Sequence, residues 1–262
     1  MRTLVINLDQ HAERLAFQTL QLQRYGLVLE RLAAVTRDDP GVHNPEHYWD
    51  SWQRPLSLSE RACLLSHRRA WEIVHAAQAP CLILEDDAVL APDVADLLVG
   101  LTRLTHVDHV TLEARQRKKI LDQSSQPLSA GRVLRRLYLD RTGAAAYVLW
   151  PSGARKLLAL ADQRCGLADG LICECPELLS HQVEPAAAFQ LDQCEALGLM
   201  APVQTTSSIT PSQHERPPRH WRHRWRRLKA QWRMGWRQLK HWPRARRRHV
   251  QVLPETFALP RS

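Results

Sequence analysis

Short apolar runs alternate with amphipathic stretches along most of the chain. Five runs predict buried strands, at Thr3–Leu8, Val28–Val35, Leu82–Leu90, Val107–Leu112 and Thr142–Trp150. Between them, apolar residues recur every three to four positions and predict helices, one ending near Gly26, one capped by Ser59, one spanning Asp93–Leu104 and one opened by Pro151. Polar residues 36–55 and 113–131 predict loops. Strands that alternate with helices predict an α/β fold with a mostly parallel central sheet.

The apolar run that begins at Leu82 ends abruptly in three consecutive carboxylates, Glu85, Asp86 and Asp87. In parallel α/β sheets, ligands collect at the carboxyl ends of the strands. Adjacent acids repel one another unless a cation or hydrogen-bond donors offset their charge, and hard oxygen ligands of this kind suit Mg²⁺ or Mn²⁺. The alternative is a solvated acidic turn leading into the next helix, near whose start Asp93 and Asp96 are favourable charges.

Charge is unevenly distributed along the 262 residues. The formal net charge is +9, but fourteen Lys or Arg and no Asp or Glu lie between Arg216 and Arg248. Removing these fourteen charges from the total leaves −5 for the rest of the chain. The composition therefore predicts a mildly acidic globular domain over residues 1–210 and a basic tail over residues 211–262.

The basic tail carries regularly spaced tryptophans. At the helical period, six apolar residues fall in a stripe about 80° wide with Arg and Lys around it; they are Trp221, Trp225, Leu228, Trp232, Trp236 and Leu239. Tryptophan on one face and arginine on the other predicts a basic amphipathic helix on an anionic membrane surface. A helix packed on the acidic domain is one alternative. Nucleic-acid binding is another alternative, but regularly spaced tryptophans on one helix face fit a planar lipid surface better than the groove of a nucleic-acid backbone.

The chain has no obvious export signal. Its first apolar segment, within Met1–Asn7, is too short for a signal peptide, and no uncharged apolar stretch reaches the roughly 18 residues of a membrane span. These features predict a cytoplasmic protein whose six cysteines are reduced. Four of them (Cys165, Cys173, Cys175 and Cys194) lack the paired spacing of a zinc site.

Four blocks of sequence resemble glycosyltransferase family 25, the bacterial lipooligosaccharide galactosyltransferases. They are VINLDQHAERL at Val5–Leu15, LSERACLLSHRRAW at Leu58–Trp71, LILEDDAVL at Leu82–Leu90 and RTGAAAYVLWPSGARKLL at Arg141–Leu158. A weaker block runs from Asp169 to Pro185 and from Gln190 to Ile209. The chain departs from the family at Ser59–Cys63, where glycines are usual, and over residues 113–131. The resemblance implies a GT-A-like nucleotide-sugar-binding fold.

The resemblance also implies roles for individual residues. The implied donor-binding residues are Asn7, Asp9, Arg14, Glu85, Asp86 and Gly143, the implied ligands of Mn²⁺ or Mg²⁺ are Asp87 and Glu85, and His67 is an implied catalytic residue. Charge on a departing nucleoside diphosphate needs such a cation or Arg and Lys nearby. From the residues alone, a solvated Arg14 and a packed structural His67 remain alternatives.

An inverting transfer needs a general base for the acceptor hydroxyl. The resemblance points to Asp169, and His181 and Glu184 are competitors. The function implied is transfer of galactose from UDP-galactose to a lipooligosaccharide, lipopolysaccharide or related glycan or glycolipid acceptor, at the cytoplasmic face of the inner membrane. A non-enzymatic nucleic-acid or lipid-binding protein on a degenerate transferase domain is the alternative, and it would have no need of the three acids.

Overall fold

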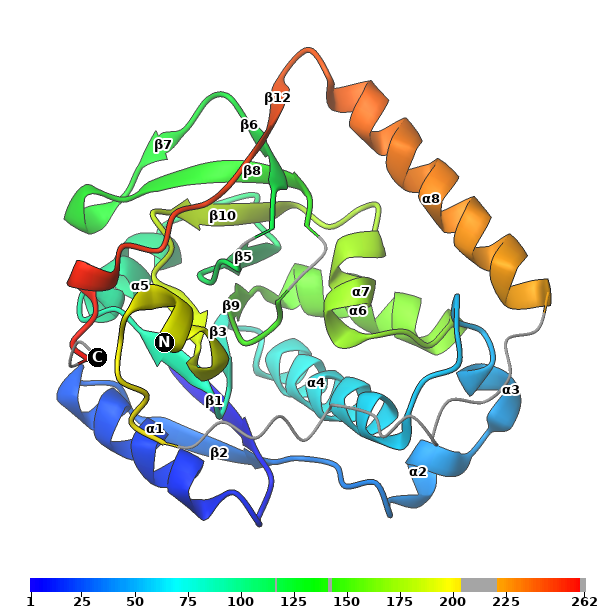
Figure 1. Ribbon diagram of the computed structural model, residues 1–262, viewed down its shortest axis with the longest axis horizontal. Helices are drawn as coiled ribbons and strands as arrows, with labels where there is room; N and C mark the ends of the chain where they lie inside the picture. Colours follow the sequence, from blue (N-terminus) through cyan, green and yellow to red (C-terminus); the bar gives the residue numbers. More distant parts are fainter. Residues whose placement is uncertain (116, 141–142, 204–220, 260–262) are drawn as a thin grey trace.

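The computed structural model describes residues 1–115, 117–140, 143–203 and 221–259 (Figure 1). The strands are β1 (Arg2–Asn7), β2 (Leu29–Ala33), β3 (Cys81–Glu85), β4 (Ala88–Leu90), β5 (His109–Thr111), β6 (Lys119–Asp122), β7 (Gln126–Pro127), β8 (Val133–Leu139), β9 (Ala146–Leu149), β10 (Ser180–Glu184), β11 (Ala188–Gln190) and β12 (Ala245–Arg248). The helices are α1 (Ala12–Arg24), α2 (Pro40–His43), α3 (Glu46–Trp49), α4 (Leu58–Ala77), α5 (Val94–Thr102), α6 (Pro151–Gln163), α7 (Ala168–Glu174) and α8 (Trp221–His241).

The central sheet is mixed. Within the described part of the chain its order is β12-β6-β8-β10-β5-β9-β3-β1-β2, with β7 beside β8. Strands β2, β1 and β3 are parallel, as expected, and β5 pairs in parallel with β10. The sheet is consistent with the expected mostly parallel one but is mixed, because β9 runs antiparallel to both β3 and β5 and β8 runs antiparallel to β10 and β6.

Helices cover both faces of the sheet. Side chains alternate along each strand, so Leu4 and Ile6 of β1 face one core cluster and Val5 faces the other. The first cluster is closed by α4 and α6, and the second by α1 and α5. This three-layer arrangement confirms the α/β class and leaves the carboxyl ends of β1 and β3 at one edge, where the chain can build a site.

Two local expectations are corrected. Helix α4 begins two residues earlier than expected, because its N-cap is Ser57 and not Ser59. The Ser57 hydroxyl accepts from the Glu60 N–H at 3.2 Å, and the Glu60 carboxylate accepts from the Ser57 N–H at 2.9 Å, which together form a capping box. The stretch 113–131, expected to be a loop, contains β6 and β7. Lys119 anchors β6 from inside, donating to the Gln182 side chain at 2.6 Å. The first part of the strand expected from Thr142 lies outside the described residues.

The C-terminal segment returns to the central sheet. Strand β12 pairs antiparallel with β6, and the Phe257 ring meets Phe189 of the core edge-to-face at 4.7 Å. Helix α8 lies along the edge of the molecule beside α7 (Figure 1). Residues 204–220, which include the expected start of the tail and the block ending at Ile209, lie outside the described residues.

No helix in the described ranges combines the length and the apolar character that crossing a bilayer would require.

Candidate active site

The three acids lie at the edge where parallel strands β1 and β3 end. Glu85 closes β3 opposite Ile6 of β1, and the chain then turns through Asp86 and Asp87 into β4. The backbone oxygen of Asp87 accepts from the Leu191 N–H at 2.9 Å, which ties the turn to the segment after β11. The pattern of an apolar run ending in acids therefore predicted the position of the cluster at the sheet edge.

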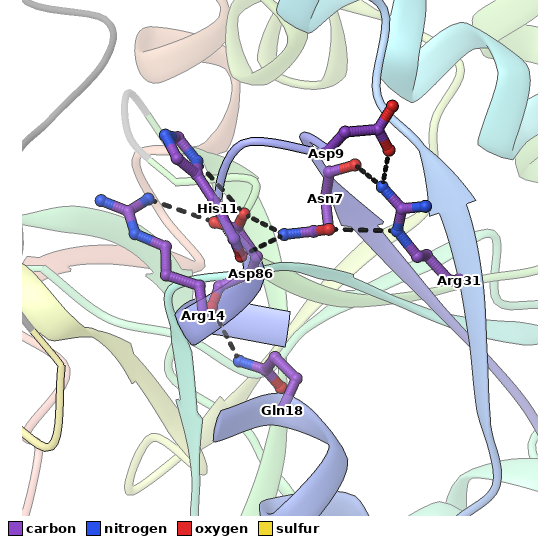
Figure 2. Close-up of polar contacts among 7 residues, drawn as sticks. All are labelled: Asn7, Asp9, His11, Arg14, Gln18, Arg31 and Asp86. Atoms are coloured by element: carbon purple, nitrogen blue, oxygen red, sulfur yellow. Dashed lines mark hydrogen bonds and ion pairs between the residues drawn. The ribbon is translucent and has the colours of Figure 1, made fainter. Parts of the chain in front are cut away.

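Asp86 is held by donors from the end of β1 and from α1 (Figure 2). Its two carboxylate oxygens accept from Asn7 Nδ2 at 2.8 Å and from Arg14 Nη1 at 3.2 Å, and His11 Nδ1 lies 3.5 Å away. Gln18 Nε2 donates to the Asp86 backbone oxygen at 3.2 Å. Both carboxylate oxygens of Asp86 thus have protein donors, and Asp86 positions Arg14 at the cavity wall.

Asn7 and Asp9 stand apart from the cavity walls. The Asn7 side-chain oxygen accepts from Arg31 Nε at 3.0 Å, and Arg31 also pairs with Asp9, whose side chain is 86% exposed (Figure 2). Neither residue lines the larger cavity beside the acids. Asn7 therefore acts on the site indirectly, by donating a hydrogen bond to Asp86, whereas the Asp9 carboxylate pairs with Arg31 at the surface.

His67 and Glu85 form the end of a buried hydrogen-bonded chain. Trp71 Nε1 donates to the Tyr147 hydroxyl at 2.8 Å, that hydroxyl lies 2.9 Å from His67 Nδ1, and His67 Nε2 lies 3.1 Å from Glu85 Oε1. Because the Glu85 carboxylate can only accept, Nε2 of a neutral His67 ring carries the proton, and Nδ1 then accepts from the Tyr147 hydroxyl, whose oxygen accepts from Trp71. Both ring nitrogens are therefore engaged.

Asp87 carries the unsatisfied oxygen of the site. Its Oδ1 atom is buried and has no hydrogen-bond partner among the residues that the structure describes. Burial, followed by the neighbouring charges of Glu85 and Asp86, raises the pKa of the Asp87 carboxyl far above its ordinary value. A divalent cation held by Asp87 and Glu85 would supply the missing partner and offset this repulsion, so the donor set fits the expected Mn²⁺ or Mg²⁺.

A second possible set of ligand atoms shares Glu85. The Cys63 thiol, the His67 ring and the Glu85 carboxylate bring three atoms within 4.8 Å of one another. Cys63 precedes His67 by one turn of α4. Burial raises the pKa of the Cys63 thiol well above its ordinary value, so this sulfur is protonated at neutral pH. A sulfur and nitrogen set suits softer ions than Mg²⁺, and the Asp87 side matches the expected hard cation better.

Two cavities meet at Glu85. The larger, of about 450 Å³, is lined by Arg14, His67, Glu85, Asp86 and Asp87 among others. The smaller, of about 200 Å³, is lined by Glu85, Arg115, Gly143, Asp169 and Gln190 among others. Gln190 Nε2 donates to Glu85 Oε2 at 3.4 Å. The predicted residues thus divide between two adjoining spaces with Glu85 in the shared wall.

Asp169 lies in the first turn of α7 and lines the smaller cavity. Burial raises the pKa of its carboxyl, and the backbone N–H groups of Gly170 and Gly143 act against that shift by donating to it. The competing bases are elsewhere: Glu184 pairs with Arg135 at 2.6 Å, and neither His181 nor Glu184 lines either cavity. The structure thus places Asp169, and not its competitors, beside Glu85.

Position 143 requires a glycine because of its backbone conformation and its contact with Glu113, neither of which the sequence shows. Its φ is +93°, and a Cβ atom there would lie 1.6 Å from Glu113 Oε1. Glu113 is buried, the Ala145 N–H donates to its Oε1 at 3.3 Å, and its Oε2 has no partner in the described part of the chain. Glu113 was missed because it falls in the expected loop, although it follows the strand β5 as closely as the acids follow β3.

Glu113 should make stability depend on pH. Burial raises the pKa of its carboxyl to about 8, so between about pH 4.5 and 8 the folded state holds a proton that the unfolded state has released. Stability is then lost as the pH rises through this window. Glu113→Gln, which keeps the oxygen facing Ala145, should raise stability at pH 8 by about 1–3 kcal/mol and change it little at pH 4.5.

Urea unfolding followed by circular dichroism at both pH values measures this difference. Glu177→Gln, at an exposed position, is the matched control. If Glu113→Gln raised the free energy of unfolding by the same amount at pH 4.5 and at pH 8, the raised pKa assigned to Glu113 would be contradicted.

Comparison with known proteins identifies the family and a relative of this chain. Residues 1–171 match the model of a family described as glycosyltransferase family 25 (LPS biosynthesis protein). A protein of Anopheles gambiae named "Glycosyltransferase 25 family member" is 27% identical over 174 residues, covering 59% of this chain and 28% of that protein. The chain therefore spans less than a third of that relative. The family match contains every predicted site residue and excludes α8.

Proposed function

Because this chain belongs to glycosyltransferase family 25, we propose that it is an enzyme that transfers a sugar from a nucleotide-sugar donor to a glycan acceptor. The two adjoining cavities support this division of substrates. The larger cavity has the volume of a typical small-ligand site and contains the acid cluster and Arg14, so we assign it to the donor. The smaller cavity, with Asp169, is assigned to the acceptor.

The acid cluster would hold the donor diphosphate through a cation. Asp87 and Glu85 are the proposed ligands of Mn²⁺ or Mg²⁺, and a bound cation would offset the negative charge that develops on the leaving diphosphate. Asp86 keeps Arg14 at the cavity wall, where its guanidinium adds positive charge. Asn7 fixes Asp86, and Gln190 and His67 fix the two oxygens of Glu85.

The proposed transfer inverts the configuration of the sugar. An acceptor hydroxyl in the smaller cavity attacks the anomeric carbon from the side opposite the diphosphate. As the new carbon–oxygen bond forms, the bond to the diphosphate oxygen breaks and the nucleoside diphosphate leaves with the electron pair. The hydroxyl proton passes to Asp169, whose raised pKa makes it a stronger base than an exposed carboxylate.

The family resemblance also points to a particular donor and acceptor. From the resemblance to lipooligosaccharide galactosyltransferases, we propose UDP-galactose as donor and a lipooligosaccharide, lipopolysaccharide or related glycan as acceptor. A non-enzymatic binding module is disfavoured because it would not need a buried carboxylate oxygen without a partner. Asp87 lines the cavity of about 450 Å³, and its buried Oδ1 atom has no partner among the described residues. This observation carries the proposal.

Calorimetry with UDP tests the donor site. We expect the full chain to bind UDP in the presence of Mn²⁺ and to bind it at least about tenfold more weakly in EDTA, because two carboxylates and a diphosphate repel one another without a cation. AMP with Mn²⁺ is the control for unspecific phosphate binding. Equal affinity for UDP with and without Mn²⁺ would remove the cation from the proposal.

His67 should act as a positioning residue for Glu85. His67→Phe removes the N–H that holds Glu85, and we expect kcat to fall about 10–100-fold with little change in KM for the donor. His67→Gln retains a donor for Glu85 and should recover most of that loss at the same melting temperature. Steady-state kinetics of both variants measure this. Equal kcat values for the two variants would assign His67 a packing role only.

A further inference from the structure

Helix α8 contacts the body of the protein through one face. His223 Nε2 lies 3.0 Å from Asp50 Oδ1, and Arg233 Nη2 donates to Glu174 Oε2 at 3.2 Å. Arg237 Nη1 donates to the Cys173 backbone oxygen at 2.8 Å. Ala230, between these residues on the same face, is 1% exposed. The polar contacts reach α7 and the turn after α3, so α8 is attached to the domain along its length.

The opposite face of α8 is apolar and exposed. Six side chains, which we call the tryptophan face, are each between 55% and 73% exposed; they are Trp221, Trp225, Leu228, Trp232, Trp236 and Leu239. Trp242 follows at 65%. Indole side chains are amphipathic and prefer the boundary between water and lipid. Most of the tryptophan face is therefore exposed in the described part of the chain.

Basic residues border the tryptophan face. Helix α8 contains no Asp or Glu, and its exposed cations include Arg224, Arg227, Lys229 and Lys240. At the helical period Lys229 and Lys240 fall on one border and Arg224 on the other. Long basic side chains on the borders can reach phosphate groups while the rings between them enter the apolar layer.

We propose that the tryptophan face binds the interface of an anionic lipid bilayer. A second copy of the chain is a poorer partner, because pairing two such faces brings cations against cations with no acid in either helix. A nucleic acid is also poorer, because the Trp232 and Trp236 rings stack on each other, with centroids 6.2 Å apart, which covers surfaces that bases would need.

The position of α8 relates this surface to the acceptor cavity. Arg233 and Arg237 contact α7, the helix whose first turn carries Asp169. Arg237 and Asp169 also line the same small cavity of about 20 Å³. A bilayer on the tryptophan face would thus lie beside the acceptor side of the domain. The link between the bilayer and the acceptor cavity rests on the proposed function. It implies that the acceptor is a membrane glycolipid held near Asp169.

Co-sedimentation of the full chain with vesicles tests the surface. We expect binding to vesicles of equal phosphatidylglycerol and phosphatidylcholine, and weak binding to phosphatidylcholine alone. Lys229→Gln with Lys240→Gln should weaken binding about fivefold per cation removed. Trp232→Ala with Trp236→Ala should weaken it about tenfold or more. The matched control is Leu20→Ala with Val28→Ala, which removes two exposed apolar side chains far from α8 in the sequence and should leave vesicle binding unchanged.

Three results would overturn the proposal: unchanged vesicle binding by the tryptophan variant, a native dimer that this variant converts to a monomer, or loss of binding to a single-stranded oligonucleotide without loss of vesicle binding. UDP calorimetry on the same variants separates this proposal from the proposed function. Retained UDP binding with lost vesicle binding supports both. Vesicle binding by a chain that never binds UDP supports the surface and removes only the link to the acceptor.

Discussion

Asp87→Asn should lower the turnover of a nucleotide-sugar donor by about 10²–10³-fold, the loss typical of removing one preorganised group that stabilises transition-state charge. Asp87 is singled out because its Oδ1 atom is buried and has no partner within the described ranges of the chain, whereas both oxygens of Asp86 accept hydrogen bonds from protein donors. The amide has nearly the same shape but carries no charge for a cation. Release of the nucleoside diphosphate, measured at saturating donor with Mn²⁺, gives the effect directly.

The folded state should survive the Asp87→Asn change. Burial and the charges of Glu85 and Asp86 already raise the pKa of Asp87, so the neutral amide removes repulsion and the melting temperature without metal should not fall. Asp96→Asn, at an exposed position in the first turn of α5, is the control and should keep full turnover. Turnover by Asp87→Asn within a factor of three of the native chain would exclude Asp87 as a ligand.

Asp169→Asn should lower kcat by about 10²–10⁴-fold, the range for loss of a positioned general base. Its carboxyl lines the cavity assigned to the acceptor, next to Glu85, and its pKa is raised by burial. Affinity for UDP should not change, because Asp169 does not line the donor cavity. Comparing kcat with the Kd for UDP separates these two effects.

The control for Asp169 is Asp162→Asn. Asp162 pairs with Arg68 at the surface, an interaction worth little to stability, and this variant should be fully active. If Asp169→Asn instead lost UDP affinity together with kcat, its carboxylate would belong to the donor site and another group would have to accept the hydroxyl proton.

Apolar periodicity predicted the elements with strong local signals. The run Leu4–Ile6 and the run before Glu85 form buried parallel strands, because alternating side chains of each serve the two core clusters. The acids were placed correctly at the sheet edge for the same reason. Asp169 was chosen as the candidate base from the family resemblance and not from any local pattern.

Features set by long-range contacts could not be predicted. Strand β6 is stabilised by buried Lys119 bonding to Gln182, 63 residues away, and a lysine in a polar stretch gives no strand signal. The antiparallel direction of β9 depends on the path of the chain between elements. The need for a glycine at position 143 comes from its positive φ and from Glu113, which only the folded chain brings next to it.

The site residues differ in how much one sequence can say about them. Asn7, His67 and Asp86 all carry groups suited to ligands, yet in the fold each is occupied by other side chains of the protein. Whether a polar group faces a ligand or supports a neighbour is decided by tertiary contacts, and residue type alone does not reveal it.

The central claim is that the acid cluster serves cation-dependent cleavage of a nucleotide sugar. Its most direct measurement is UDP release by the unmodified full chain from a panel of UDP-sugars, with Mn²⁺ or with EDTA, in the presence of a glycan acceptor. We predict selective release from UDP-galactose with Mn²⁺ and none with EDTA. Release that is equal in Mn²⁺ and EDTA would contradict the role assigned to Asp87 and Glu85.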